Sequence, residues 1–298
     1  MKTRQITTWL MAGAVLSTVF TSCKKSDDTA TLPSIGGYNS SNDVSSSNLL
    51  AHWTFDGTNN EAVSGMAPSK SSNASFTTGV KGQALQLSSG YLVYPTITAL
   101  SSASALGSVT VSAWVNTSNN ATTASEIFAL TSPTATDWGQ MVNLLVETGQ
   151  KAATIDTLII HGFVGQYTAG TRSGQDNINT GDAVDAGNKF KVVKGAGKWT
   201  HVVLKYDGSA STIDIYANGV VVSNSNYRVR GTTGALVFPT PTQVLIGAFP
   251  NVSSGFASSA NQVWQGLFNG SIDELRVYNK ALSDTDVSSL YQLELAGR

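Results

Sequence analysis

The stretch Ile213-Asp214-Ile215-Tyr216-Ala217-Asn218-Gly219-Val220-Val221-Val222 carries the clearest local structural signal in the chain. Apolar Ile213 and Ile215 alternate with Asp214, as in a strand with one buried face. The pair Asn218-Gly219 supplies the positive φ angles of a type I′ turn, whose twist matches that of the flanking strands. The stretch therefore predicts a tight β-hairpin.

Similar short apolar segments, separated by turn residues, extend from this hairpin in both directions along the chain. The other predicted strands are Leu50–Phe55, Ala84–Leu87, Tyr91–Tyr94, Val109–Val115, Ile127–Leu130, Met141–Val146, Thr157–Val164, Trp199–Tyr206, Gln243–Ala248 and Gly270–Tyr278. Many short strands over about 250 residues are typical of a single β-sandwich or barrel.

One helix and one long loop interrupt this pattern. The helix is predicted over Asp284–Glu294, with Ser283 as its N-cap and acidic residues near its positive end. The segment Thr168–Gly181 is rich in Gly, Thr and Asn and reads as a long loop, which in a compact domain is usually functional or mobile.

The composition narrows the classes of function. Only 12% of the 298 residues are charged and the net charge is -1, whereas a typical domain has about 25% charged residues. Polarity comes instead from 37 Ser and 33 Thr. No basic field exists to bind nucleic acid, and the single cysteine excludes both a disulfide scaffold and a four-cysteine zinc site.

The first residues predict an exported, lipid-anchored protein. Lys2 and Arg4 precede an apolar run that is too short to span a membrane, so residues 1–22 read as a signal peptide. The sequence Val19-Phe20-Thr21-Ser22-Cys23 resembles a bacterial lipoprotein box, which implies lipidation of Cys23 and a mature chain held by more than one acyl chain. Residues 23–48 are polar and are expected to form a flexible linker before a domain at 49–298.

The order of several motifs resembles the concanavalin A-like lectin/glucanase superfamily, in particular its laminin-G-like branch. The motifs are His52–Gly57, Gly79–Leu87, Val109–Val115, Gly197–Val203, the hairpin at Asn218-Gly219, and Phe268–Tyr278. The resemblance implies an all-β jelly-roll sandwich of two antiparallel sheets with a short C-terminal helix. It defines function less well, because members of this superfamily bind sugars, proteins or metals, and some are enzymes.

The same resemblance implies one structural calcium ion. Alternation along Gly270–Tyr278 predicts that Asp273, Leu275 and Val277 share the core-facing side. Asp273 then requires either a cation or several hydrogen-bond donors. Relatives place a second ligand at a position that matches Asp56 or the carbonyl of Gly57. These residues alone cannot supply the six to eight oxygens that calcium takes, so backbone N–H donors to Asp273 are the alternative.

The acidic residues do not show the catalytic pattern of the superfamily's glucanases. Those enzymes place carboxylates on one strand as Glu-x-Asp-x-x-Glu, so that i and i+2 share a face. Among the 19 acidic residues, the only i, i+2 pair is Asp284 and Asp286, at the start of the predicted helix. A non-enzymatic role is therefore favoured, although carboxylates from two different strands could still form a pair. The three histidines all lie inside predicted strands, where packed or exposed side chains are commoner than catalytic ones.

We therefore predict a carbohydrate-binding protein of the outer membrane, exposed at the cell surface. Lys24-Lys25-Ser26-Asp27-Asp28 resembles the export signal of surface lipoproteins in glycan-degrading bacteria, and this implies other surface glycan-uptake proteins as partners. Sugar recognition requires aromatic faces with polar neighbours. The candidate residues in loop-like settings are Trp138, Trp264 and Tyr167, with Asp137, Gln140 and Gln265 beside them. The alternatives are a protein–protein adhesion module, and a glycoside hydrolase or polysaccharide lyase with an unrecognised site.

Overall fold

The computed structural model describes residues 32–181, 189–229 and 231–298. Residues Ser34–Arg298 form one compact unit. The predicted signal peptide and the predicted lipidation site Cys23 lie outside the described residues. No helix within the described ranges is long and apolar enough to span a membrane.

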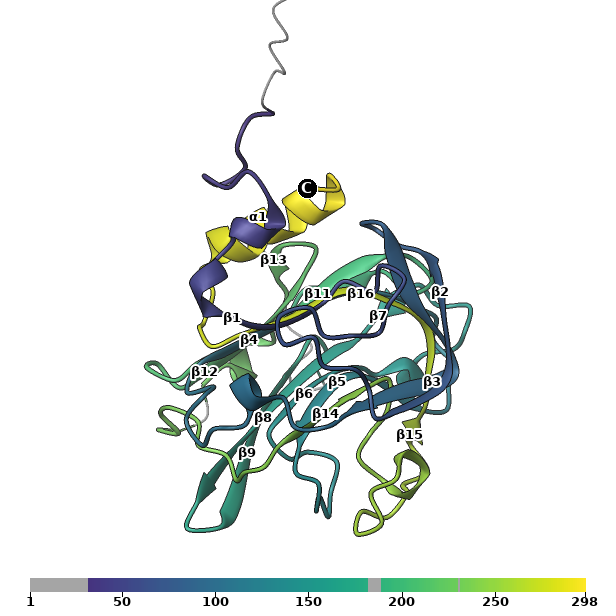
Figure 1. Ribbon diagram of the computed structural model, residues 1–298, viewed down its shortest axis with the longest axis vertical. Helices are drawn as coiled ribbons and strands as arrows, with labels where there is room; N and C mark the ends of the chain where they lie inside the picture. Colours follow the sequence, from purple (N-terminus) through teal and green to yellow (C-terminus); the bar gives the residue numbers. More distant parts are fainter. Residues whose placement is uncertain (1–31, 182–188, 230) are drawn as a thin grey trace, which may run out of the picture. The chain divides into compact units, whose positions relative to one another are not determined.

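The described residues form a β-structure with one α-helix near the C-terminus (Figure 1). The strands are β1 (Leu49–Trp53), β2 (Lys70–Thr78), β3 (Gln83–Tyr94), β4 (Val109–Thr117), β5 (Ala124–Thr131), β6 (Val142–Val146), β7 (Thr157–Leu158), β8 (Ile160–Thr168), β9 (Thr171–Ile178), β10 (Val193–Lys194), β11 (Thr200–Asp207), β12 (Thr212–Ala217), β13 (Val220–Val221), β14 (Gln243–Ile246), β15 (Gln265–Gly266) and β16 (Phe268–Tyr278). The helix α1 covers Asp284–Leu295, and short 3₁₀ turns include Ser41–Asp43 and Thr148–Gln150.

Most strands join one large sheet in the order β13-β12-β11-β4-β16-β3-β14-β5-β6-β8-β9. The pairs along this path are antiparallel; β1 also pairs with β16 and β2 with β3, while the short β15 runs parallel to β5. The sheet curls so that its two halves face each other: a Cβ atom on Gly162 of β8 would lie 2.6 Å from Leu204 of β11. This arrangement confirms the predicted jelly-roll sandwich, and β7 and β10 form a small second sheet.

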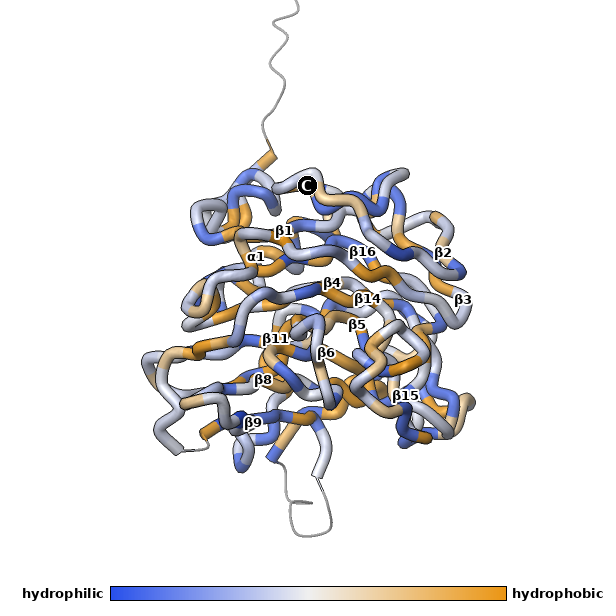
Figure 2. The backbone as a smooth tube through the Cα atoms, turned by 60° about the horizontal axis from the view of Figure 1, so that its bottom comes forward, coloured by the Kyte–Doolittle hydropathy of each residue, from blue (hydrophilic) through white to orange (hydrophobic). Residues whose placement is uncertain are grey.

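The core lies between the two halves of the sheet. Strands such as β8 and β11 carry hydrophobic stretches in Figure 2, and the side chains of Trp53, Phe128 and Leu204 are fully buried. The predicted hairpin is confirmed, because Asn218 and Gly219 have φ angles of 49° and 76° between β12 and β13.

The prediction of a long loop over Thr168–Gly181 is wrong for most of that segment. Residues Thr171–Ile178 form β9, which pairs with β8 through a turn at Ala169-Gly170. The sequence hides this strand because its buried side chains are polar. Asn177, for example, is fully buried and donates to the carbonyl oxygens of Ile213 and Asn224.

The predicted face of Asp273 is also wrong. Asp273 pairs with Trp114, and the register to β4 shifts between Asp273 and Arg276. This β-bulge arises at Glu274, which has a left-handed φ of 47°. The extra residue turns Leu275 and Val277 to the inner core together with Ile272, so that Asp273 lies on the opposite face of β16 from them.

The C-terminal helix packs on the outer face of the sheet. Ser283 caps it by accepting a hydrogen bond of 3.0 Å from the N–H of Asp286, as predicted. Val287, Leu290 and Leu293 are buried against outward-facing side chains of β11, β12 and β16. The chain from Ser34 to Asn48, which falls within the predicted linker, belongs to the same compact unit. The 3₁₀ turn there lies beside α1 (Figure 1).

Candidate functional site

Two tryptophans form the wall of a pocket on the face of β6 and β8 that points away from the inner core. Trp138 comes from the loop between β5 and β6, and Trp264 immediately precedes β15. Their ring centroids lie 5.4 Å apart with the planes nearly perpendicular, at 86°. The pocket has a volume of about 390 Å³, and its lining also includes Glu147 and His161. We call it the tryptophan pocket.

Strand alternation explains why these side chains meet. In β6 and β8 the apolar residues Leu144, Val146 and Ile160 face the inner core, which turns His161 and Phe163 outward. Both outward rings contact Trp138, with centroid distances of 6.0 Å to His161 and 5.4 Å to Phe163. Trp264 packs at 5.1 Å against Phe249. Each tryptophan is half-buried: part of its ring packs against these aromatic side chains, and another part lines the pocket.

An acid–imidazole–acid arrangement forms the polar side of the pocket. His161 Nδ1 lies 2.8 Å from Glu147 Oε1, and His161 Nε2 lies 3.5 Å from Asp176 Oδ2. Burial alone would lower the pKa of the His161 imidazole, but the contacts with Asp176 and Glu147 outweigh burial and raise this pKa to about 9. His161 is therefore a cation at neutral pH, balanced by two carboxylates.

The structure brings together two of the six candidate binding residues in this pocket, namely Trp138 and Trp264. Tyr167 donates a hydrogen bond of 2.9 Å to Gln140 Oε1, and neither side chain belongs to the lining. Asp137 forms an ion pair of 2.7 Å with Arg172.

The amide of the sixth candidate, Gln265, is also engaged. Its Oε1 accepts a hydrogen bond of 2.7 Å from Asn251. Tyr167, Gln140, Asp137 and Gln265 therefore contribute to positioning the loops around the pocket rather than to its lining.

Sequence reasoning missed Glu147, His161 and Asp176 as a group. Glu147 follows β6, whereas His161 lies on β8, and only the β6–β8 register brings them close. One signal was available: His161 and Phe163 are two residues apart in a strand, so they share a face. The sequence contained no comparable signal that placed Trp138 over that face.

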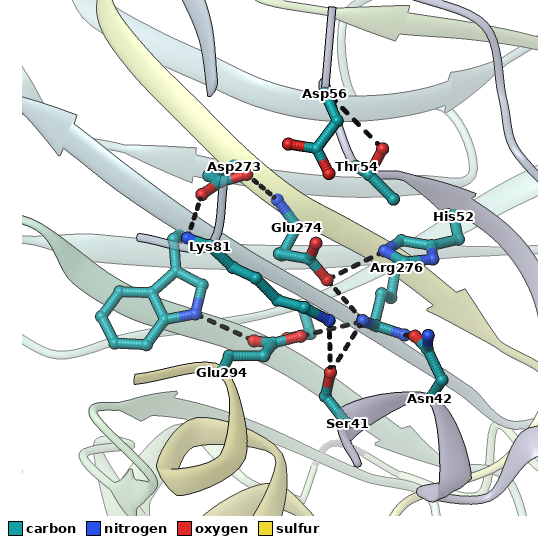
Figure 3. A network of polar contacts seen from close by, with 12 residues as sticks. Ser41, Asn42, His52, Thr54, Asp56, Lys81, Asp273, Glu274, Arg276 and Glu294 are labelled. Atoms are coloured by element: carbon teal, nitrogen blue, oxygen red, sulfur yellow. Dashed lines mark hydrogen bonds and ion pairs between the residues drawn. The ribbon is translucent and has the colours of Figure 1, made fainter. Parts of the chain in front are cut away.

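A second polar group lies between β16 and α1 (Figure 3). The fully buried Arg276 is at its centre. Arg276 donates to Glu294 Oε1 at 2.8 Å and to Asn42 Oδ1 at 3.0 Å, and it forms an ion pair with Glu274. Glu274 also contacts His52 Nε2 at 3.0 Å.

The two glutamates of this group differ in pKa. Burial raises the pKa of the Glu294 carboxyl to about 7, against the attraction of Arg276. Burial acts in the same direction on Glu274, but its hydrogen bond to His52 and the charge of Arg276 lower that pKa to about 2. The group joins the N-terminal segment, the sheet and the helix, and its burial indicates a structural role.

The candidate calcium residues lie next to this group, around the turn at residues 79–83. Asp273 accepts backbone hydrogen bonds from Val80 at 2.8 Å, Lys81 at 3.1 Å and Glu274 at 2.8 Å. Asp56 accepts one of 2.7 Å from Gln83. Within the described residues no group of three or more His, Cys, Asp or Glu side chains is placed to hold a metal ion.

The backbone hydrogen bonds of Asp273 compete with calcium for its carboxylate oxygens. Both carboxylate oxygens of Asp273 already accept hydrogen bonds from backbone N–H groups, and such donors are the predicted alternative to a cation. Burial nevertheless raises the pKa of Asp273 to about 7 despite those donors. Its negative charge is therefore only partly compensated by the three backbone donors.

Comparisons with known proteins place this fold in a family. A laminin G family model, described as the concanavalin A-like lectin/glucanases superfamily, matches residues 88–288. A search of the curated proteins finds no match. Among solved structures, the chain is similar to domain 4 of AbnA, a GH43 extracellular arabinanase from Geobacillus stearothermophilus, in complex with arabinotriose. That similarity has 19% identity and a TM-score of 0.50, and it covers 82% of this chain and 98% of that chain.

Binding domains of botulinum neurotoxins are also similar. The domain of neurotoxin DC in complex with rat synaptotagmin II has 13% identity and a TM-score of 0.53, covering 84% of this chain and 52% of that chain. The same toxin domain in complex with SialylT has 16% identity and a TM-score of 0.52, covering 86% and 52%. This chain thus spans about half the length of the toxin chains, and at these identities the likeness concerns the fold. By the family match over residues 88–288, the chain belongs to the concanavalin A-like lectin/glucanase superfamily.

Proposed function

We propose that this protein binds glycans, and that the tryptophan pocket is the binding site. The observation that carries the proposal is the perpendicular pair Trp138 and Trp264 at 5.4 Å, which forms the wall of a pocket of about 390 Å³. Aromatic faces next to a few fixed polar groups are what a site for sugar rings requires. Glu147 supplies a carboxylate acceptor for hydroxyl groups, and its position is fixed by His161.

The similar structures are compatible with this proposal and with one alternative. Domain 4 of the arabinanase is in complex with arabinotriose, and the toxin domain is in complex with SialylT. The toxin domain is also in complex with the protein synaptotagmin II. We favour glycans for this chain because the candidate site is a recessed pocket, whereas a protein partner usually occupies a larger and flatter surface.

Affinity electrophoresis of the full chain in gels that contain different polysaccharides tests the proposal. We expect at least one neutral polysaccharide to retard migration, and Trp138→Ala and Trp264→Ala each to weaken the interaction about tenfold or more, as for aromatic hot spots. The control is Phe76→Ala, because Phe76 is an exposed aromatic side chain on β2, outside the pocket.

Retardation that is unchanged in both tryptophan variants would contradict the assignment of the site. No retardation by any polysaccharide would contradict glycan binding and favour the adhesion module. Release of reducing sugars during the assay would instead support the enzyme alternative.

We further propose that the protein acts at the outer membrane surface, attached through lipidated Cys23. The support is the sequence alone: a basic start, a short apolar run and the residues before Cys23. Protease treatment of intact cells tests exposure, and a protein that is protected until lysis would contradict it. Other surface glycan-uptake proteins are the proposed partners.

Calcium also remains a proposal, for the turn at residues 79–83. The partly compensated charge of the buried Asp273 supports it, and the backbone donors of Val80 and Lys81 are the competing explanation. Thermal melts with added calcium and with a chelator decide between them. A higher Tm with calcium, lost in Asp273→Asn, would support the ion, whereas identical melts would contradict it.

A further inference from the structure

A second pocket of about 370 Å³ lies where β3, β4 and β16 approach the start of β5. Every residue in its lining is Asn, Gln, Ser, Thr or Gly, so the lining contains no ionisable and no aromatic side chain. The residues that matter most for the argument are Gln86, Asn116, Asn119, Asn269 and Ser271. We call this the amide pocket.

Strand register places three of these side chains in a row. Gln86 of β3 pairs with Ser271 of β16, and Ser271 pairs with Asn116 of β4. Directly paired residues of antiparallel strands point to the same face of a sheet. The Ser271 hydroxyl donates to Gln86 Oε1 at 2.7 Å, which fixes the orientation of that amide. Gln86 Nε2 donates to the carbonyl oxygens of Leu87 at 3.3 Å and Gly270 at 3.1 Å. The row therefore presents oriented acceptor oxygens, and beside them the amide of Asn116, which can both donate and accept.

Asn119 adds a buried acceptor that lacks a partner. Its Nδ2 donates to the carbonyl oxygens of Ile155 at 2.7 Å and Thr157 at 2.9 Å. These two acceptors fix which end of the amide is nitrogen. Asn119 Oδ1 is consequently an acceptor; it is buried without a hydrogen bond, and the residue is only 3% exposed. Such an unsatisfied group is costly, and a ligand hydroxyl could satisfy it.

The amide pocket and the tryptophan pocket share one segment of chain. Asn120 and Ser125 line the amide pocket, whereas Thr122 and Ala124 line the tryptophan pocket. The Cα atoms of Asn120 and Thr122 lie at most about 7.6 Å apart, since consecutive Cα atoms are about 3.8 Å apart. A chain-like ligand that occupies one pocket thus needs to cross only this short segment to reach the other.

We infer that the amide pocket is a second subsite, which binds hydroxyl groups of the same neutral glycan chain that the tryptophan pocket holds. This inference rests on the proposed function and adds the ligand class: an uncharged oligosaccharide long enough to fill both pockets. Uncharged side chains that both donate and accept match hydroxyl groups, which do the same. An anionic sugar would enter a pocket that has no cation to pair with its charge.

The two subsites are expected to contribute differently. The amide pocket exchanges hydrogen bonds to water for hydrogen bonds to ligand, which is a small net gain, and it has no aromatic face to stack on a ring. It is therefore weak alone. Linked to the tryptophan pocket through one ligand, it raises affinity because the second contact becomes intramolecular. Affinity should accordingly increase with the length of the oligosaccharide.

Amide and indole NMR signals of the full chain report on the two pockets separately. The probes are neutral arabino-, xylo- and gluco-oligosaccharides of two to six sugar residues. Side-chain NH₂ signals of Gln86, Asn116 and Asn269 report on the amide pocket, and indole N–H signals of Trp138 and Trp264 on the tryptophan pocket. We expect the longer oligosaccharides to shift both sets of signals, and the disaccharides to shift the indole set.

Calorimetry on variants measures the contribution of the amide pocket. For the hexasaccharide that binds best, Asn116→Ala is expected to raise Kd about tenfold, equivalent to the loss of one or two net hydrogen bonds. For the disaccharide the same variant should change Kd less than about twofold. The control is Asn60→Ala, because Asn60 is an exposed asparagine that lines neither pocket.

The outcomes separate this inference from the proposed function. Indole shifts without amide shifts, together with an unchanged Kd in Asn116→Ala, would overturn the second subsite and leave glycan binding in place. Amide shifts without indole shifts would overturn the tryptophan pocket as the primary site and the linkage between the two pockets. No shift of either set by any of these oligosaccharides would overturn both.

Discussion

The pairing of His161 with two carboxylates predicts a specific dependence of stability on pH. The imidazole lies 2.8 Å from Glu147 and 3.5 Å from Asp176, and its side chain is 12% exposed. The two acids raise the pKa of folded His161 to about 9, whereas an unfolded histidine has a pKa of about 6.5. Replacing this residue by His161→Gln removes the charge and retains a polar side chain of similar size.

The direction of this pH dependence follows from whether the folded or the unfolded protein binds the proton more tightly. Between pH 6.5 and 9 the folded protein holds a proton on His161 that the unfolded chain has lost. The stabilising contribution is therefore fully present below pH 6.5 and disappears as the pH rises through 9. A pKa difference between about 9 and about 6.5 corresponds to about 3 kcal/mol of unfolding free energy.

Urea unfolding of the full chain at pH 6, 7.5 and 9.5, followed by tryptophan fluorescence, measures this contribution. The free energy of unfolding of the wild type minus that of His161→Gln should be about 3 kcal/mol larger at pH 6 than at pH 9.5. Other groups that titrate in this range are common to both proteins, so the subtraction removes them. His52→Gln is the control of opposite sign, because burial lowers the pKa of His52.

Two results would refute the reasoning. An equal difference at all three pH values would show that His161 is not a cation in the folded protein at neutral pH. A difference that is smaller at pH 6 than at pH 7.5, and then constant up to pH 9.5, would show that burial, rather than Glu147 and Asp176, controls its titration. His52 is buried as the neutral imidazole, so its contribution to stability is lost as the pH falls below 6.5. The free energy of unfolding of the wild type minus that of His52→Gln should therefore not decline toward pH 9.5.

Further predictions concern the buried charges and the packing of β9. Glu294→Ala leaves the fully buried Arg276 with one carboxylate fewer and should lower the free energy of unfolding by about 3–5 kcal/mol. Lys194→Ala breaks an exposed ion pair and should leave the free energy of unfolding almost unchanged. Equal losses in urea unfolding would contradict this contrast. Gly174→Val should lower stability by about 1–3 kcal/mol, because even a Cβ at Gly174 would lie 2.4 Å from the ring of Phe163; an unchanged urea midpoint would show that the ring moves aside without cost.

Local sequence patterns predicted most of the fold. The Asn218-Gly219 turn, the cap at Ser283 and the alternating strands depend on neighbours in sequence, and the structure contains all of them. Strand β9 was missed because Gln175 and Asn177 are buried polar side chains whose partners lie more than 30 residues away. A polar pattern is typical of a loop unless those distant partners are known.

The candidate site was predictable only in part, for a related reason. Trp138 and Trp264 stood out because large aromatic side chains are unusual in polar loop-like segments, and the structure places them together. Glu147 and His161 became a pair only through the register of β6 and β8. The face of Asp273 could not be predicted, because one left-handed residue, Glu274, shifts the alternation of β16.

The structure shows where the few charged side chains of the chain lie. Of the 15 acidic residues in the part of the chain that the structure describes, six are buried. Those at β16 and α1 surround a buried arginine or accept backbone hydrogen bonds. Much of the scarce charge therefore serves the interior of the fold. The amide pocket has no charged side chain, and His161 in the tryptophan pocket is balanced by its own carboxylates. The recognition that we propose at both pockets depends on amides, hydroxyls, one carboxylate and indole faces, and these groups match uncharged hydroxyl-rich ligands better than ionic ones.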